Sequence, residues 1–397
     1  MINFSSLRRI TSSGNFIPEI DGLRFLAIAM VMLFHLDGFL MKELRGNYID
    51  AVTDYQWLHS IFQYGYFGVE IFFCISAFVV ALPFAKFYLS NGPKISLKNY
   101  FLRRITRIEP PYLISLFLML LTHLYILNGE RFSDYLPSFY YSLAYAHGFF
   151  YHRDFQPLVN NVTWSLEIEV QFYILAPIFF YLFFKKENYR LYILLACTLF
   201  VSILSKFPKP NTISLFEYFH YFLLGISLAY MKASKIQWSI LEKINDKYSQ
   251  TFISILAFFA MIITDITFTG PLATWFKIIL SSLQMFFLFV VFYNLLLSEH
   301  KKIWINKPFV TLLGGMCYSI YLLHNQLIMS IGHLLLKIGW TKYFILDYFL
   351  LLIILLISVL LVSSLFYLLI ERPCMDKNWP KKLLNLMSSK SNGQGII

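Results

Sequence analysis

Apolar residues run in long stretches along this 397-residue chain, and short polar segments separate them. Ten of these stretches approach or exceed the roughly 20 residues that a helix needs to cross the hydrocarbon core of a bilayer. The pattern predicts an all-α fold, a polytopic integral membrane protein of ten transmembrane helices. These helices are predicted at residues 22–41, 61–87, 108–127, 162–184, 189–206, 214–231, 251–268, 272–297, 308–336 and 343–370.

The rest of the chain leaves little room for a second domain. Residues 135–151 are aromatic but contain His147 and are followed by charged residues, so we expect an external re-entrant or interfacial segment there. Residues 388–397 are polar, which predicts a disordered tail. We therefore interpret residues 1–387 as a single transmembrane domain.

Basic residues mark alternate loops between the predicted helices. Lysine and arginine gather before the first helix, after every second helix and near the C-terminus, and the other loops contain few of them. Such an excess is typical of cytoplasmic loops. We therefore expect both termini in the cytoplasm, in agreement with an even number of helices.

Composition supports the same class of protein. The chain is 58% hydrophobic and only 14% charged, whereas soluble domains are about one quarter charged. The net charge of +11 does not indicate nucleic-acid binding, because the basic residues are spread over short loops and form no single patch. The four cysteines lack metal-ligand spacing, so we expect neither a metal site nor a disulfide framework.

Two residues of the first predicted helix are costly in an apolar environment. Arg24 and His35 are eleven residues apart, which places them on one helix face and about 16 Å apart along the axis. Ionisable residues inside a membrane helix are functional candidates. The alternative is that Arg24 only anchors the helix at the cytoplasmic side and that His35 is a hydrogen-bonded core residue.

The predicted orientation sorts the other candidates into two groups. Histidine and carboxylates, the groups that move protons in acyl transfer, are expected in the outer half, with His324 near mid-depth. Arginines at the cytoplasmic face suit a phosphate-bearing ligand, although topology alone also explains basic residues there. The outer group is His35, Glu70, Trp164 and Glu169, and the cytoplasmic group is Arg24, Arg103, Arg104 and Arg107.

Six segments, in order along the chain, resemble the acyltransferase 3 family of integral membrane acyltransferases. Two depart slightly from the family pattern, because Glu70 stands where Asp is usual and Ala77 where Gly is usual. The segments are IDGLRFLAIAMVMLFHL at 20–36, GVEIFFCISAFVV at 68–80, RRITRIEPPY at 103–112, WSLEIEVQFYILAPI at 164–178, YSIYLLHNQLI at 318–328 and ERPCMDK at 371–377.

The resemblance implies a multi-pass enzyme of a bacterial plasma membrane. Such an enzyme takes an acyl group, by default acetyl, from cytoplasmic acyl-CoA and delivers it to a hydroxyl of a cell-surface or exported glycan. Some members of the family carry a fused extracytoplasmic SGNH domain, and because this sequence stops after its tenth predicted helix, we expect a stand-alone form. Polysaccharide, lipid-linked saccharide, peptidoglycan, a small molecule and a lipid all remain open as acceptor.

The hypothesis assigns a role to each candidate residue. Arg24, Arg104 and Arg107, with Arg103 as a helper, would hold the CoA phosphates. His35 would act as general base or carry the acyl group itself, and Glu70 or Glu169 would orient its imidazole. Trp164 and His324 are expected to contact the substrate.

Two other classes of protein compete with this hypothesis. A polytopic transporter or flippase of a saccharide or lipid-linked substrate would also place ionisable residues within the membrane. Many transporters contain paired halves with matching interrupted helices, and this sequence shows no such halves. A non-catalytic membrane subunit would leave Arg24, His35, Glu70 and Glu169 without explanation.

Overall fold

The structure, a computed structural model, is helical, and its described residues form no β-strand. It describes residues 9, 16–44, 48, 55–127, 132–184, 189–205, 207, 211–247, 249–266, 274–298, 304–338, 341, 343–376 and 378–380. The predicted tail at 388–397 lies outside the described residues.

Within these residues, six helical stretches are long and apolar enough to cross a membrane. They are Pro18–Glu43, Gln56–Ser90, Leu97–Tyr125, Asn161–Phe183, Trp275–Leu296 and Phe344–Cys374. The apolar helices Tyr189–Leu204 and Gln250–Thr264 are shorter. The structure thus confirms an all-α protein with membrane-spanning helices, whereas the number of ten and the cytoplasmic termini stay predictions.

Each predicted helix nevertheless corresponds to helical backbone. The longer helices are α1 (Pro18–Glu43), α3 (Phe67–Ser90), α4 (Leu97–Thr122), α7 (Trp164–Phe183), α8 (Tyr189–Leu204), α9 (Leu215–Ser234), α11 (Gln250–Ile266), α12 (Thr274–Leu296), α14 (Cys317–Leu336) and α15 (Phe344–Phe366). Shorter elements are α2 (Gln56–Phe62), η3 (Gln63–Tyr66), η4 (His123–Leu127), α5 (Phe132–Leu143), α6 (His147–Phe150), η5 (Asn161–Thr163), α10 (Ser239–Lys247), α13 (Pro308–Gly315), η7 (Tyr367–Glu371) and α16 (Arg372–Cys374). The segment at 135–151 forms α5 and α6, neither of which is among the membrane-spanning stretches.

One predicted helix is wrong in its continuity. The apolar run at 308–336 breaks at Met316 into α13 and α14. Gly314 lies so close to the backbone of Asp21 that an added Cβ would collide with the Asp21 carbonyl. The break lets α13 pack against the start of α1 while α14 packs along its later turns.

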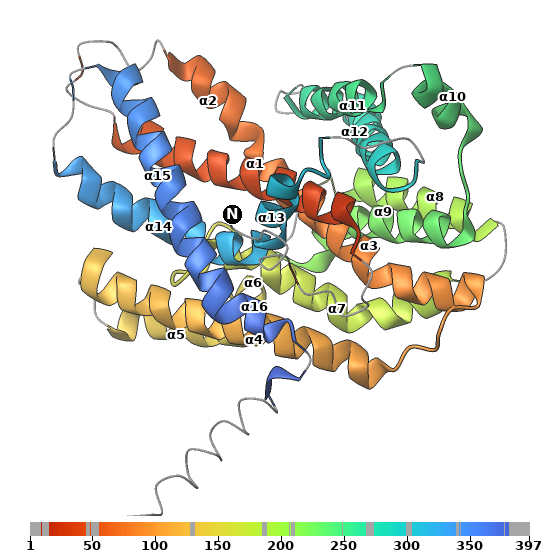
Figure 1. Ribbon diagram of the computed structural model, residues 1–397, viewed down its shortest axis with the longest axis horizontal. Helices are drawn as coiled ribbons and strands as arrows, with labels where there is room; N and C mark the ends of the chain where they lie inside the picture. The colour runs from red at the N-terminus through yellow and green to blue at the C-terminus, as the bar shows by residue number, and fades with distance from the viewer. Residues whose placement is uncertain are drawn as a thin grey trace, which may run out of the picture.

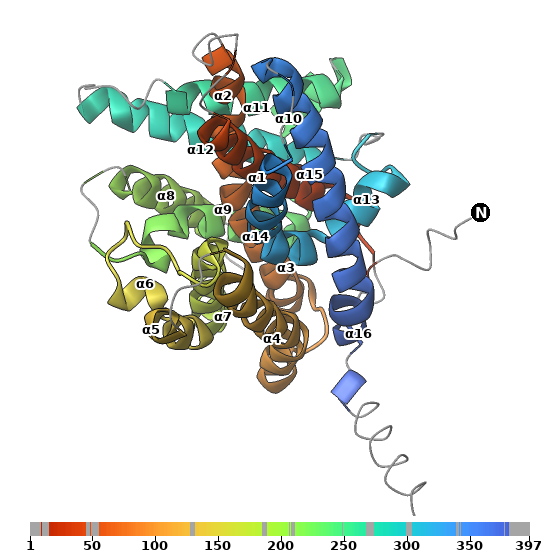
Figure 2. The ribbon, with the colours of Figure 1, turned by 90° about the vertical axis from the view of Figure 1, so that its left-hand side faces the viewer.

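Helix α1 crosses the middle of the molecule and joins its two main hydrophobic clusters (Figure 1). Its first turns, with Leu23 and Ala27, pack in a cluster with α3, α7, α9 and α12. Its later turns, with Met32 and Leu36, pack in a second cluster with α14 and α15. Helices α4, α5 and α7 lie together at one end of the molecule, and α11 and α12 lie at the other (Figure 2).

Small residues allow α1 and α3 to approach closely. A Cβ added at Gly68 would collide with the carbonyl of Ala27, and one added at Gly65 would collide with the carbonyl of Met30. Helix packing in membranes relies on such small residues, because apolar burial alone gives little preference for helix contact over lipid. Gly68, the first residue of the second family-like segment, and Gly65 in η3 therefore position α3 against the helix that carries Arg24 and His35.

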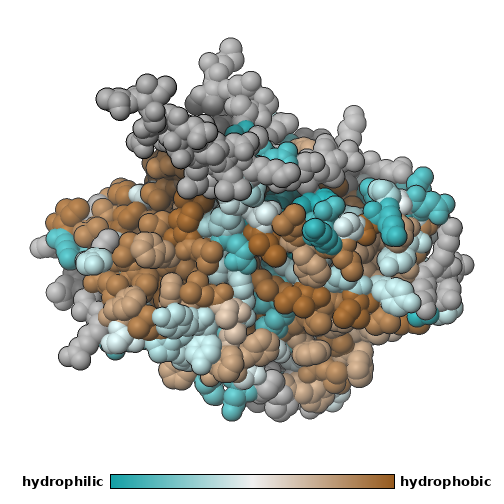
Figure 3. Space-filling view, turned by 90° about the horizontal axis from the view of Figure 1, so that it is seen from below, coloured by the Kyte–Doolittle hydropathy of each residue, from teal (hydrophilic) through white to brown (hydrophobic). Residues whose placement is uncertain are grey.

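The outer surface of the protein is largely apolar. Viewed from the end formed by α4, α5 and α7, hydrophobic residues cover much of the coloured surface, and hydrophilic residues lie in its middle and toward its edges (Figure 3). Large side chains such as Phe117, Ile174 and Leu361 are exposed. Exposed apolar surface of this extent is typical of a protein surrounded by lipid.

Candidate active site

The start of α1 carries a buried ion pair. Pro18 occupies the first turn of the helix, where its missing N–H costs nothing, and Asp21 follows in the same turn. Nη1 of Arg24 donates a 2.7 Å hydrogen bond to Oδ1 of Asp21, and Nε of Arg9 lies 3.6 Å from the same oxygen. Asp21 is only 1% exposed. Arg24 is thus a buried cation whose charge Asp21 partly neutralises. Asp21 was not among the candidate residues predicted from the sequence.

Arg9 extends this cluster beyond the helix. Burial and the neighbouring Arg24 lower the pKa of Arg9 to about 9. The guanidinium is therefore still protonated at neutral pH, and two cations share one buried carboxylate. An excess of positive charge at a buried position favours an anionic ligand.

The three arginines of α4 point in different directions. Arg103 is exposed, and its Nε donates to the carbonyl of Asn99 at 3.2 Å. Arg104 is half-buried, with its Cζ 3.7 Å above the ring of Tyr100 and 5.2 Å from the ring of Tyr173. Arg107 interacts electrostatically with Glu169 and Glu371. Arg104 and Arg107 therefore face the interior, whereas Arg103 lies at the surface.

Glu169 connects α7 to these arginines. The Tyr173 hydroxyl donates a 2.6 Å hydrogen bond to Oε2 of Glu169, and the Ser76 hydroxyl lies 2.7 Å from the Tyr173 hydroxyl. Arg24 and Arg107 both interact electrostatically with the Glu169 carboxylate. The structure thus brings together Arg24, Arg104, Arg107 and Glu169, with Tyr173 at the centre of the group.

A second buried carboxylate holds the start of α14. Glu371, at the end of η7, accepts a 3.0 Å hydrogen bond from the backbone N–H of Ser319 and a further one from the Ser319 hydroxyl. The first N–H groups of a helix lack partners within that helix, and the break at Met316 creates such groups. Glu371, part of the sixth family-like segment, therefore fixes α14 beside the arginine cluster.

His35 meets His324 further along α1. Their ring centroids are 5.0 Å apart, and the Phe34 ring lies 5.1 Å from that of His35. His35 is partly exposed, whereas His324 is completely buried. Sequence reasoning named both residues but did not predict that they meet.

The tautomer of His324 follows from its hydrogen bonds. Its Nδ1 lies 2.8 Å from the carbonyl oxygen of Tyr321 and 3.1 Å from that of Ile320. Carbonyl oxygens only accept, so Nδ1 carries the hydrogen and, in the neutral ring, Nε2 carries a lone pair. Nε2 is buried and has no hydrogen-bond partner among the described residues.

The segment before α7 holds α14 in place. The Tyr321 hydroxyl donates to the carbonyl of Val162 and lies 3.0 Å from the Ser165 hydroxyl. Nδ2 of Asn325 donates to Oδ1 of Asn161 at 2.6 Å. These bonds, one turn or less from His324, restrict its position relative to α7.

Glu70 and Trp164 lie around Tyr218 of α9. The Trp164 and Tyr218 rings are 5.5 Å apart, and Glu70 interacts electrostatically with Tyr218. The structure therefore places Glu70 near Trp164 and places Glu169 among the arginines. The ring of His324 contacts that of His35, and the orientation of His35 by Glu70 or Glu169 stays a prediction.

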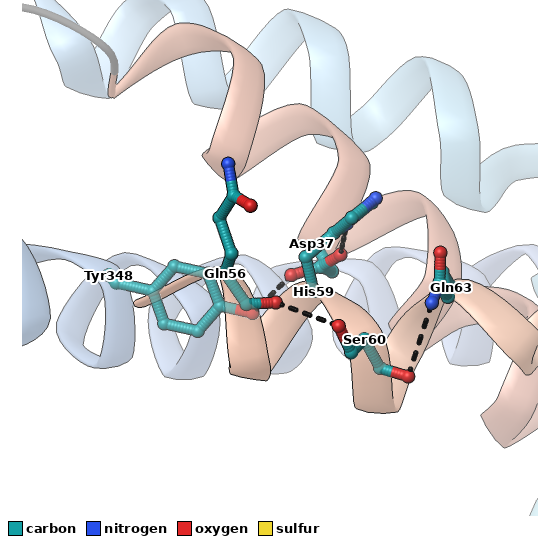
Figure 4. A network of polar contacts seen from close by, with 6 residues as sticks. All are labelled: Asp37, Gln56, His59, Ser60, Gln63 and Tyr348. Atoms are coloured by element: carbon teal, nitrogen blue, oxygen red, sulfur yellow. Dashed lines mark hydrogen bonds and ion pairs between the residues drawn. The ribbon is translucent and has the colours of Figure 1, made fainter. Parts of the chain in front are cut away.

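A network around Asp37, also missed from the sequence, joins three elements on the other side of α1 (Figure 4). Oδ2 of Asp37 lies 2.6 Å from Nδ1 of His59 in α2, and Oδ1 accepts a 2.8 Å hydrogen bond from the hydroxyl of Tyr348 in α15. The Asp37 carboxylate is buried, whereas His59 is half-exposed. The network fixes α2 and α15 against the half of α1 that carries His35.

Comparison with known proteins agrees with the family-like segments. Residues 17–368 match the family model described as an acyltransferase domain, which is the model of the acyltransferase 3 family. The match includes every candidate residue named above except Arg9 and Glu371. No solved structure matches the chain.

Several curated relatives carry O-acetyltransferase names. SACOL0978 of Staphylococcus aureus (strain COL), provisionally named an O-acetyltransferase, is 25% identical over 345 residues, or 79% of this chain and 51% of the relative. The peptidoglycan O-acetyltransferase OatA of Listeria monocytogenes is 28% identical over 183 residues, or 44% of this chain and 25% of the relative. The matches thus span about half of the first relative and a quarter of the second.

Proposed function

Because the chain belongs to the acyltransferase 3 family, we propose that it is a membrane-embedded O-acetyltransferase that moves an acetyl group from acetyl-CoA to a hydroxyl group of a cell-envelope glycan. The observation that carries this proposal is the division of α1, with the buried arginine cluster at one end and the paired imidazoles at the other. The names of the relatives support peptidoglycan as the first acceptor to examine.

The arginine cluster is proposed to hold the donor. The CoA part of acetyl-CoA carries phosphates, which guanidinium groups bind through paired hydrogen bonds. Arg24, Arg104 and Arg107 would contact them from the interior, and Arg103 from the surface. The basic loops support a cytoplasmic entrance to this site, with both termini in the cytoplasm of a bacterial plasma membrane.

The imidazole of His35 is proposed to act as the general base. It takes the proton of the acceptor hydroxyl while the hydroxyl oxygen attacks the thioester carbon, forming the C–O bond. The C–S bond then breaks, and the proton passes from His35 to the leaving sulfur to give free CoA. About 16 Å along α1 separates His35 from Arg24, a span that the flexible arm of CoA would cover.

Trp164 and Glu70 are proposed to contact the acceptor. An indole ring offers an apolar face for a sugar ring, and a carboxylate accepts hydrogen bonds from sugar hydroxyls. Both residues lie around Tyr218, which supports a shared site.

The proposal is tested with purified protein in proteoliposomes, radiolabelled acetyl-CoA and peptidoglycan fragments. The native chain is expected to transfer label to the fragments, and His35→Ala to reduce transfer by about a hundredfold or more, the range for a lost general base. His333→Leu is the matched control, because His333 lies on the same helix as His324 but contacts Phe39. Full activity of His35→Ala would refute the assigned base, and failure to use acetyl-CoA with any hydroxyl acceptor would refute the function.

The same material distinguishes the base from an acyl carrier. Incubation with labelled acetyl-CoA but without acceptor leaves the protein unlabelled if His35 is a base. Label retained on the native chain and absent from His35→Ala would instead assign the carrier role to this histidine.

A further inference from the structure

His324 presents an unused hydrogen-bond acceptor beside His35. Two backbone carbonyls, of Ile320 and Tyr321, fix the hydrogen on Nδ1, so the Nε2 lone pair remains free. That atom is completely buried and has no partner among the described residues. A buried acceptor without a partner is unfavourable for the fold alone, so this atom is available to a further hydrogen-bond donor.

The position of the two rings indicates the partner. The ring centroids are 5.0 Å apart. At this separation, a small rotation of the His35 ring can bring one of its nitrogens within hydrogen-bond distance of a nitrogen of His324. His35 is free to rotate in part, because it is partly exposed and its ring contacts are with Phe34 and His324. His324 is fixed by its backbone bonds and by the Tyr321 and Asn325 side chains on the same turns.

We propose that His324 is the positioning residue of His35, with its Nε2 accepting the ring N–H of His35 while the other His35 nitrogen takes the acceptor hydroxyl proton. The inference rests on the proposed function. A base of this kind needs an acceptor at its second nitrogen, which selects the reactive tautomer and stabilises the imidazolium that forms. A carboxylate has this role in the serine-protease triad, and here a neutral imidazole supplies the lone pair.

A neutral acceptor has a physical advantage at this position. A carboxylate at a fully buried position needs a partner for its charge, as Glu371 and Asp21 show elsewhere in this protein. His324 provides an acceptor without adding charge. The proton balance of the reaction is unchanged, because the hydroxyl proton still goes to His35 and then to the sulfur of CoA.

The test compares two substitutions of His324 in the proteoliposome assay with acetyl-CoA and peptidoglycan fragments. His324→Leu removes the acceptor and is expected to lower kcat ten- to a hundredfold with little change in KM. His324→Gln restores an acceptor oxygen near the position of Nε2 and is expected to recover much of kcat. His333→Leu, which also removes an imidazole bonded to a backbone carbonyl of α14, is expected to leave both constants unchanged.

The outcomes separate this inference from the proposed function. Normal kcat in His324→Leu, together with an inactive His35→Ala, would overturn the inference and leave the function standing. A raised KM at unchanged kcat would overturn it as well, because His324 would then contact the substrate. Equal loss in the Leu and Gln variants, with normal melting temperatures in detergent, would show that the acceptor lone pair is irrelevant.

Discussion

Tyr173 and Glu169 lie one turn apart on α7, and the phenol of the first donates a 2.6 Å hydrogen bond to the carboxylate of the second. The same phenol lies 2.7 Å from the Ser76 hydroxyl of α3, and its ring lies beneath the guanidinium of Arg104. One side chain therefore holds together the carboxylate and one of the cations to which we assign donor binding.

Tyr173→Phe tests this connection. The change keeps the ring beneath Arg104 but removes the Tyr173 hydroxyl as a donor to Glu169, so we expect a several-fold increase in KM for acetyl-CoA and a stability loss of about 1–2 kcal/mol. Initial rates and thermal unfolding in detergent measure the two effects. Tyr181→Phe, on the same helix but 63% exposed, is the control, and equal behaviour of the two variants would argue against the role of Tyr173.

The arginines of α4 should differ in importance. Arg104→Lys keeps a charge but loses the planar group that stacks on Tyr100, and we expect a loss of about tenfold or more in kcat/KM for acetyl-CoA. Arg107→Lys should behave similarly. Arg103→Lys should change kcat/KM by less than about threefold, because the lysine keeps an exposed positive charge that can face the phosphate. The largest loss at Arg103 would contradict the interior donor site.

Glu371 should matter for stability more than its place near the C-terminal end of the described chain suggests. Glu371→Gln weakens the cap on Ser319 and leaves Arg9 and Arg107 with less opposing charge, so we expect a loss of about 1–3 kcal/mol. The melting temperature in detergent measures it. Asp154→Asn, whose carboxylate is 77% exposed, should leave that temperature nearly unchanged.

Asp37 should be required for the attachment of α2 and α15. Asp37→Ala leaves the Tyr348 hydroxyl and the His59 imidazole without their acceptor, and a loss of about 2–3 kcal/mol is expected for the two bonds together. Tyr348→Phe removes one bond and should cost about 1 kcal/mol. A double-mutant cycle between these residues measures the coupling, and additive losses would show that the two side chains are independent.

Gly65 and Gly68, which lie against α1, should tolerate a larger side chain less well than Gly38 does. Gly68→Leu places a side chain against the Ala27 carbonyl, so we expect failure of the protein to accumulate in membranes in folded form. Gly38→Leu should be tolerated, because the space around Gly38 is open to at least 4 Å. The yield of monodisperse protein after detergent extraction compares them, and Gly65→Leu is expected to follow Gly68→Leu.

The helices could be predicted because their cause is local. Runs of apolar residues and alternating basic loops indicate membrane helices wherever they occur. The break at Met316 was missed, since it depends on how Gly314 packs against Asp21, nearly three hundred residues earlier in the chain. The local indication of this break in the sequence is the glycine pair Gly314 and Gly315 within the apolar run.

In the candidate site, too, some features have a local cause in the sequence and others depend on contacts between distant segments. Arg24, His35 and Glu169 stand out as ionisable residues in apolar surroundings, and the structure places Arg24 and Glu169 together. The pairing of His35 with His324, and of Asp37 with His59 and Tyr348, joins elements that are distant in the sequence. Periodicity carries no information on such pairs, so only the packed helices reveal them.

The continuity of α1 has a consequence for the size of the donor. Arg24 and His35 belong to one helix without an internal proline, so the distance between them is set by its rise per residue and stays constant as neighbouring helices move. The helix would therefore set the distance between the bound phosphates and the reacting thioester. A donor whose phosphates rest on the arginines would present its thioester at one fixed depth, and a longer acyl chain would have to extend past the two imidazoles.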